Sequence, residues 1–138
     1  MLANAFLSAK DLDLTERERT ALILVLGVLE SGEITWTQVD DIDDMDGPDY
    51  EPPPGNHFSM AYWLEEGDCG TVCCIGGLAE KLGNVQFPFD DPRPVNGLFF
   101  PVAFERVIEL HTITVEQAAK ATRNFLTTGH PDWNEVLK

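Results

Sequence analysis

The sequence has no lysine or arginine between Arg19 and Lys81. Residues 20–80 carry 13 acidic side chains, so this stretch supplies most of the net charge of −15. Such a surface repels nucleic acid and anionic membrane, and we expect direct contact with neither. It would attract a basic protein partner. A gain in solubility is the simpler interpretation of the same acidic surplus.

Other absences narrow the class of protein further. The N-terminus lacks the basic region of a secretory signal, and the apolar run at residues 21–29 is too short to span a bilayer. Three cysteines, an odd number without secreted context, suggest reduced thiols in the cytoplasm. There is no internal repeat and no phosphate-binding glycine loop. We expect a cytoplasmic globular protein whose 138 residues form one domain, residues 1–138.

The strongest helix signal covers residues 15–31. Thr15 is a suitable N-cap, and Glu18 stands three residues later, as a capping box requires. Because residues 21–29 are apolar almost throughout, this helix should lie at the centre of the fold. Gly27 within it suggests the close approach of a neighbouring element.

An acidic, proline-rich stretch follows and predicts a flexible loop at residues 40–55. Seven of the twelve residues from 40 to 51 are acidic, so this segment is a candidate for a calcium-binding loop. Placing Gly47 at the invariant glycine of an EF-hand loop puts Ile42 at the first ligand position and Pro53 at the last, so that motif fails. Weak binding of divalent cations by clustered carboxylates stays an alternative to a simple solvated loop.

All three cysteines lie between residues 69 and 83, where we predict a helix from Cys69 or Thr71 to Leu82, ended by Gly83. Gly76 and Gly77 together cost this helix about 2 kcal/mol of propensity relative to alanine. We expect that cost to be offset by close packing against residues 21–29. The predicted inward stripe has helical spacing: Val72, Ile75, Ala79 and Leu82.

The later chain adds helices at residues 102–111 and 114–127, the second opened by a capping box at Thr114. The inward stripe of the second is Val115, Ala118, Ala119, Thr122, Phe125 and Leu126. A small two-stranded ribbon could occupy residues 34–39 and 85–89. The predicted fold is mainly α: a single compact domain of four or five helices joined by long proline-rich acidic loops.

Four segments in fixed order resemble an uncharacterised family of small bacterial and bacteriophage proteins. An aromatic lead-in precedes Cys-Gly-Thr-x-x-Cys-Ile-x-Gly, then Leu-Phe near a proline, then a Thr-x-x-Gln-Ala-Ala helix. These segments are residues 58–63, 69–77, 98–101 and 114–133. Leu78 stands where the family often has tryptophan, and Cys73 is an additional thiol. The resemblance covers residues 15–133 and implies a shared fold but no activity.

Cys69 is the candidate catalytic residue. A helix N-terminus favours a thiolate, as in thiol enzymes. Against this, neither His57 nor His111 occupies a recognisable catalytic setting. Three carboxylates just upstream would also raise the thiol pKa: Glu65, Glu66 and Asp68. A buried structural cysteine is the competing interpretation.

The cysteines also suggest a metal site or a disulfide. Cys69 and Cys73, one helical turn apart, could bind zinc together with His57 or His111, but a second ligand pair is missing. Cys69 and Cys74 would be about 7.5 Å apart along a helix axis, too far for a disulfide unless Cys69 precedes the helix.

The sequence contains no complete catalytic constellation. We therefore expect a small non-enzymatic protein that acts through protein–protein contacts, without a cofactor. One alternative is an acidic protein that mimics nucleic acid and inhibits a basic protein or acts as its decoy. Another is a thiol enzyme that uses Cys69.

Overall fold

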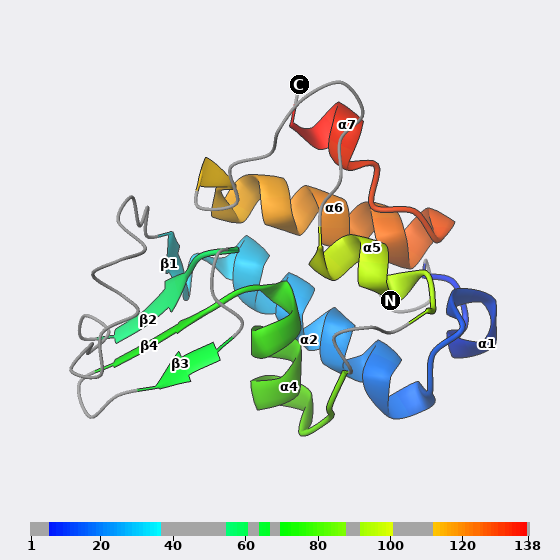
Figure 1. Cartoon of the computed structure of the whole chain (residues 1–138), viewed down its shortest axis with the longest axis horizontal. Helices are drawn as coiled ribbons and strands as arrows, with labels where there is room; N and C mark the ends of the chain where they lie inside the picture. Colours follow the sequence, from blue (N-terminus) through cyan, green and yellow to red (C-terminus); the bar gives the residue numbers. More distant parts are fainter. Residues whose placement is uncertain are drawn as a thin grey trace.

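The computed structural model describes residues 6–36, 55–60, 64–66, 70–87, 92–100 and 112–137. The fold is mainly helical, as predicted, and a small sheet lies at one end (Figure 1). Within the described ranges, the three longer helices are α2, α4 and α6, and the other helices are single turns. The helices are α1 (Ala9–Leu12), α2 (Glu16–Ser31), α4 (Ile75–Gly83), α5 (Val95–Phe99), α6 (Val115–Thr128) and α7 (Trp133–Val136).

The sheet is larger than the predicted two-stranded ribbon. Its strands are β1 (Thr35–Trp36), β2 (Gly55–Phe58), β3 (Leu64–Glu66) and β4 (Gly70–Cys73), in the order β1-β2-β4-β3. The pairs β1–β2 and β2–β4 are parallel, and β3–β4 is antiparallel. Of the two predicted ribbon positions, residues 34–39 contain β1. The described part of 85–89, residues 85–87, contains no strand.

The predicted start of the cysteine-containing helix is wrong. Gly70–Cys73 is strand β4, and the helix begins only at Ile75, after Cys74 in extended conformation. As a strand, this segment forms backbone hydrogen bonds with β2 and with β3. No pattern within residues 70–73 predicts that pairing. Val72 therefore belongs to no helical stripe. Leu82, predicted to face inward, is 38% exposed.

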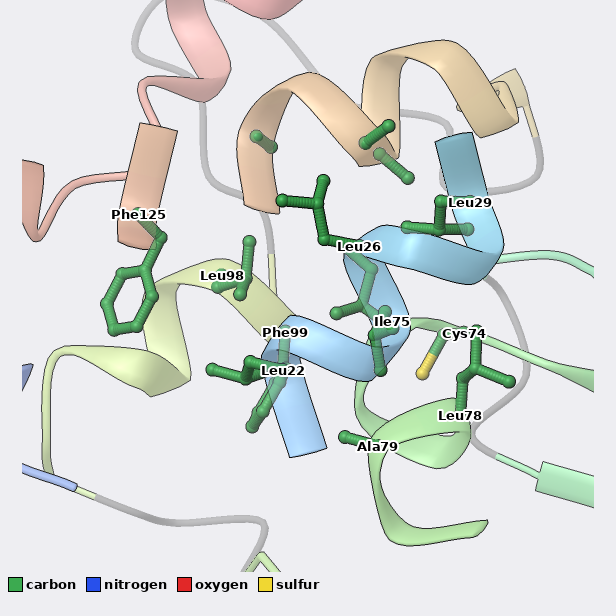
Figure 2. Close-up of a cluster of buried hydrophobic side chains, with 14 of the residues drawn as sticks. Leu22, Leu26, Leu29, Cys74, Ile75, Leu78, Ala79, Leu98, Phe99 and Phe125 are labelled. Atoms are coloured by element: carbon green, nitrogen blue, oxygen red, sulfur yellow. The ribbon is translucent and has the colours of Figure 1, made fainter. Parts of the chain in front are cut away.

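Helix α2 lies at the centre, between α4 and α6 (Figure 1). Its predicted capping box is confirmed: Thr15 Oγ1 accepts from Glu18 N at 3.1 Å, and Glu18 Oε1 accepts from Thr15 N at 2.8 Å. Gly32 ends the helix with a φ of 82°, which favours glycine. One side of α2 joins the buried cluster in Figure 2, where Leu22, Leu26 and Leu29 are labelled.

The close approach between α2 and α4 occurs at Gly83. A Cβ atom placed there would lie 2.2 Å from the Cβ of Ala21, so only glycine fits. Gly83 is the last residue of α4, and Asn84, with a φ of 52°, is its C-cap. Gly27 has no such neighbour: a Cβ there meets no atom within 4 Å among the described residues. The predicted close approach at Gly27 is therefore wrong within this chain.

Helix α6 begins with the second predicted capping box, and its end is hydrogen-bonded to Leu7 in the N-terminal segment. The second capping box is confirmed: Thr114 Oγ1 accepts from Gln117 N at 3.2 Å, and Gln117 Oε1 accepts from Thr114 N at 2.9 Å. The six residues of its predicted inward stripe are all buried. Leu7 N donates to the carbonyl of Leu126 at 2.7 Å, and Arg19 Nε donates to the carbonyl of Leu7, also at 2.7 Å. Leu7 is thus hydrogen-bonded to both α2 and the end of α6.

Two predicted segments lie wholly or almost wholly outside the described residues. The predicted helix at residues 102–111 lies outside the described residues. The same is true of the predicted acidic loop at residues 40–55, except Gly55, which begins β2. None of the helices in the described ranges is long and apolar enough to cross a membrane.

Candidate functional site

The two described cysteines lie in the core. Cys73 is 1% exposed and Cys74 is 2% exposed, and neither is in a disulfide. The Cys73 thiol donates a long hydrogen bond, 4.0 Å, to the carbonyl oxygen of His57. Figure 2 shows Cys74 beside Ile75 and Leu78 in the buried cluster. The candidate nucleophile Cys69 lies outside the described residues.

The environment of Cys74 opposes thiolate formation. Burial raises the pKa of the Cys74 thiol to about 11. The backbone N–H groups of Gly77 and Gly76, at the start of α4, lower it only in part. At neutral pH the group is therefore a protonated thiol, and it functions as a small apolar side chain rather than a nucleophile.

The proposed zinc ligands do not converge in the described part of the chain. The zinc hypothesis requires Cys69 and Cys73 to lie one helical turn apart, but Cys73 is in strand β4. The register pairs Cys73 with Phe58 and His57 with Val72, so Cys73 and His57 direct their side chains to opposite faces of the sheet. The described residues contain no group of three or more His, Cys, Asp or Glu residues that could hold a metal ion.

A groove of about 760 Å³ separates the end of α2 from the first half of α6. Four apolar residues form its floor, and all four are at most 9% exposed: Leu29, Ile34, Val115 and Ala119. Charged and polar side chains form its rim: Glu30, Thr114, Glu116, Lys120 and Arg123. This volume is typical of ligand-binding clefts.

An ion pair connects the two walls of the groove. Arg123 Nη2 donates to Glu30 Oε1 at 2.7 Å, and Arg123 Nε donates to Glu30 Oε2 at 3.1 Å. The hydrogen bonds that Arg123 donates to the Glu30 carboxylate raise the pKa of the Arg123 guanidinium, which therefore stays charged across the neutral range. The Arg123 guanidinium also lies 5.9 Å from the centre of the Phe6 ring, a cation–π distance.

Two further charges stand one turn apart on the α6 side of the groove. Glu116 and Lys120 are exposed, and neither forms an ion pair or side-chain hydrogen bond with another described residue. The rim can therefore offer one charge of each sign above an apolar floor. Among the described residues, no cysteine or histidine lines this groove. The arrangement suits binding of an apolar group with polar flanks better than acid–base or nucleophilic chemistry.

The groove is not among the sites that the sequence predicts. The sequence predicts Ile34 in a possible ribbon, and it does not distinguish the charged residues of α6 from an ordinary solvated helix face. One local signal was present: Glu116, Lys120 and Arg123 have the helical spacing i, i+4, i+7, next to the buried stripe of the same helix. Only the tertiary fold places the end of α2 opposite them.

Comparison of the chain with protein-family models, with curated proteins and with solved structures gives no match. The resemblance to small bacterial and bacteriophage proteins stays a prediction. The function must therefore be inferred from the groove, the buried thiols and the charge of the chain.

Proposed function

We propose that this chain is a small non-enzymatic protein that acts through protein–protein contacts, and that its groove holds an apolar segment of the partner. The observation that carries the proposal is the apolar floor of Leu29, Ile34, Val115 and Ala119, open between two helices that the Glu30–Arg123 ion pair connects. The buried, protonated Cys74 supports a non-catalytic role. The cytoplasm, where thiols remain reduced, is the compartment that suits it.

The contacts available in the groove set the chemistry of the partner segment. Each apolar side chain that it buries there contributes about 1.5–3 kcal/mol of transfer free energy. Glu116 and Lys120 on the rim would select the orientation of the segment through its flanking charges. Beyond the groove, the net charge of −15 favours a partner with a basic surface.

A peptide-display selection on the full chain tests this proposal. The selected peptides are then measured on Ala119→Phe, which fills the groove, and on Thr128→Phe, a control at the exposed end of the same helix. We expect Ala119→Phe to weaken binding by at least about tenfold, the equivalent of 1.4 kcal/mol, and the control to bind as the unmodified chain does. Peptides that bind both variants equally would show that the groove is not the binding site.

The nucleic-acid mimic is a second proposal, and it rests on the acidic stretch alone. Of its 13 acidic residues, the described ranges include Glu30, Glu33, Glu65, Glu66 and Glu80. Competition with DNA for a basic DNA-binding protein, measured at low and high salt, tests it. No displacement of DNA at low salt would end this alternative.

The thiol-enzyme alternative depends on Cys69. Its test is the pH dependence of alkylation by iodoacetamide, with Cys69→Ser as the control. A catalytic thiolate would react with an apparent pKa well below the ordinary thiol value of about 8.5. An ordinary or raised value would leave Cys69 with a structural role.

A further inference from the structure

The two helices that form the groove run antiparallel. The carboxylate of Glu30, near the end of α2, meets Arg123 in the middle of α6. Further back, Leu7 is hydrogen-bonded to Arg19, near the start of α2, and to Leu126, near the end of α6. Figure 1 shows the same opposed directions of the two helices. The groove therefore follows α6 from its N-cap to Arg123, about 14 Å along the helix axis.

A segment bound in this groove needs hydrogen-bond partners for its own backbone. Most backbone groups of a helix are bonded within it, so helical walls offer few partners. At the start of α6 the capping box already satisfies the N–H of Gln117. An extended segment on the apolar floor would leave part of its backbone without partners, whereas a helix satisfies its own. The small side chain of Ala119 on the floor leaves space for a large apolar side chain of such a helix.

The charges of the rim have a fixed order along α6. Glu116 and Lys120 are exposed and lie one turn apart on the same side of the helix. Glu30 and Arg123 neutralise each other, so a bound segment meets mainly the anion of Glu116 and the cation of Lys120. A helix that runs antiparallel to α6 reaches Lys120 first and Glu116 one turn later. It complements both when it carries an acidic residue four positions before a basic one, an order that also stabilises an isolated helix.

We propose that the groove holds an amphipathic helix of the partner, antiparallel to α6. Its apolar stripe covers the floor, and its edge places an acidic residue opposite Lys120 and a basic residue four positions later opposite Glu116. This inference rests on the proposed function, since it assumes that the groove binds a protein segment, and it adds the conformation, direction and charge order of that segment. Binding of a helix in an apolar groove is a recurring mode of peptide recognition, and the rim charges then select the direction of the helix.

Two synthetic peptides of about three helical turns test the proposal. Both are held helical by a covalent staple and share one leucine stripe and one composition. The first has Glu four residues before Lys on the edge that faces α6 in the antiparallel direction, and the second has these two residues exchanged. Fluorescence anisotropy with the full chain measures both dissociation constants. The unmodified chain should bind the first peptide about fivefold more tightly, because two exposed ion pairs replace two like-charge contacts. At 1 M salt, where the Debye length is about 3 Å, this preference should disappear.

The decisive variant reverses the charge order of the chain itself. Glu116→Lys combined with Lys120→Glu keeps the net charge and should reverse the preference, so that the second peptide binds about fivefold more tightly than the first. The matched control exchanges two exposed charges at the start of α2, outside the groove: Glu16→Arg with Arg17→Glu. The control should keep the original preference. Thermal melts of both double variants confirm that they fold.

Equal affinities for the two peptides overturn this inference, as does a preference that the charge-reversed chain retains. Absence of binding by both peptides overturns it too. So does equally tight binding of an unstapled peptide with a central proline, since proline breaks a helix. The proposed function survives each of these results if peptides from the display selection still lose affinity on Ala119→Phe. Selected peptides that bind Ala119→Phe as tightly as the unmodified chain remove the proposed function and this inference together.

Discussion

Two glycines in helices have opposite roles at the residue scale. Gly83→Ala places a methyl group 2.2 Å from the Cβ of Ala21, so α2 and α4 must separate. We expect a loss of about 1–3 kcal/mol in the free energy of unfolding. Gly27→Ala meets open space and should raise the stability by up to about 1 kcal/mol. Urea denaturation of the two variants measures both effects, and equal effects of the same sign would contradict the close approach at Gly83.

Glu18 makes stability depend on pH. Burial alone would raise the pKa of this carboxyl, but hydrogen bonds from Arg93 and Thr15 outweigh it and hold the pKa below the ordinary 4.5. The folded pKa is depressed, so the contribution of Glu18 is complete above the unfolded value. It is lost as pH falls from about 4.5 through the folded pKa.

Glu18→Gln isolates this contribution. The amide can still form the capping box, as Gln117 does in α6, but it cannot form a charged pair with Arg93. We expect a loss of about 1.5–3 kcal/mol at neutral pH and a shallower decline of stability below pH 4.5. Denaturation curves at neutral and acid pH measure both. An unchanged acid decline would show that other carboxyls determine it.

The buried thiols give a prediction for chemical modification. Cys73 and Cys74 are at most 2% exposed, and burial raises the pKa of Cys74 to about 11. In the native protein at neutral pH both should resist a thiol reagent and react only when the chain unfolds. Mass spectrometry after brief labelling, with and without denaturant, identifies the modified residues. Rapid native labelling of Cys74 would contradict its burial.

At the scale of elements, the two capping boxes should be equivalent in effect. Thr15→Ala and Thr114→Ala each remove the side-chain acceptor at the start of a long helix. We expect each to cost about 1 kcal/mol, within a range of 0.5–2. Thermal denaturation measures the loss, and Thr15→Ser and Thr114→Ser, which keep the acceptor, serve as controls.

Elements with local signals could be predicted from the sequence, and elements without them could not. Helices α2 and α6 were recognised because a capping box and an apolar stripe lie within one segment. Strand β4 was mistaken for a helix because its pairing with β2 joins Gly55 to Gly70, which no local pattern reveals. The groove was missed for the same reason, since Glu30 and Arg123 on its walls are 93 residues apart.

At the scale of the whole molecule, the net charge of −15 opposes the compact state. Screening by salt should therefore raise the melting temperature between about 0.01 M and 1 M NaCl, as the Debye length falls from about 30 Å to about 3 Å. Screening also weakens the exposed Glu30–Arg123 ion pair, which would lower the melting temperature. Such a pair, however, contributes only about 0–1 kcal/mol to stability. Differential scanning calorimetry measures the net change. A lower melting temperature at high salt would mean that ion pairs outweigh self-repulsion.

The hydrogen bond between Leu7 and Leu126 has a consequence for the synthesis of this protein. A ribosome releases α2 early, yet the helix that covers one of its sides, α6, comes from residues 115–128. Until that last part emerges, the nascent chain carries an uncovered apolar helix and cannot complete its core. Premature termination before residue 112 would thus leave a product suited to capture by chaperones and to proteolysis, rather than a smaller stable domain.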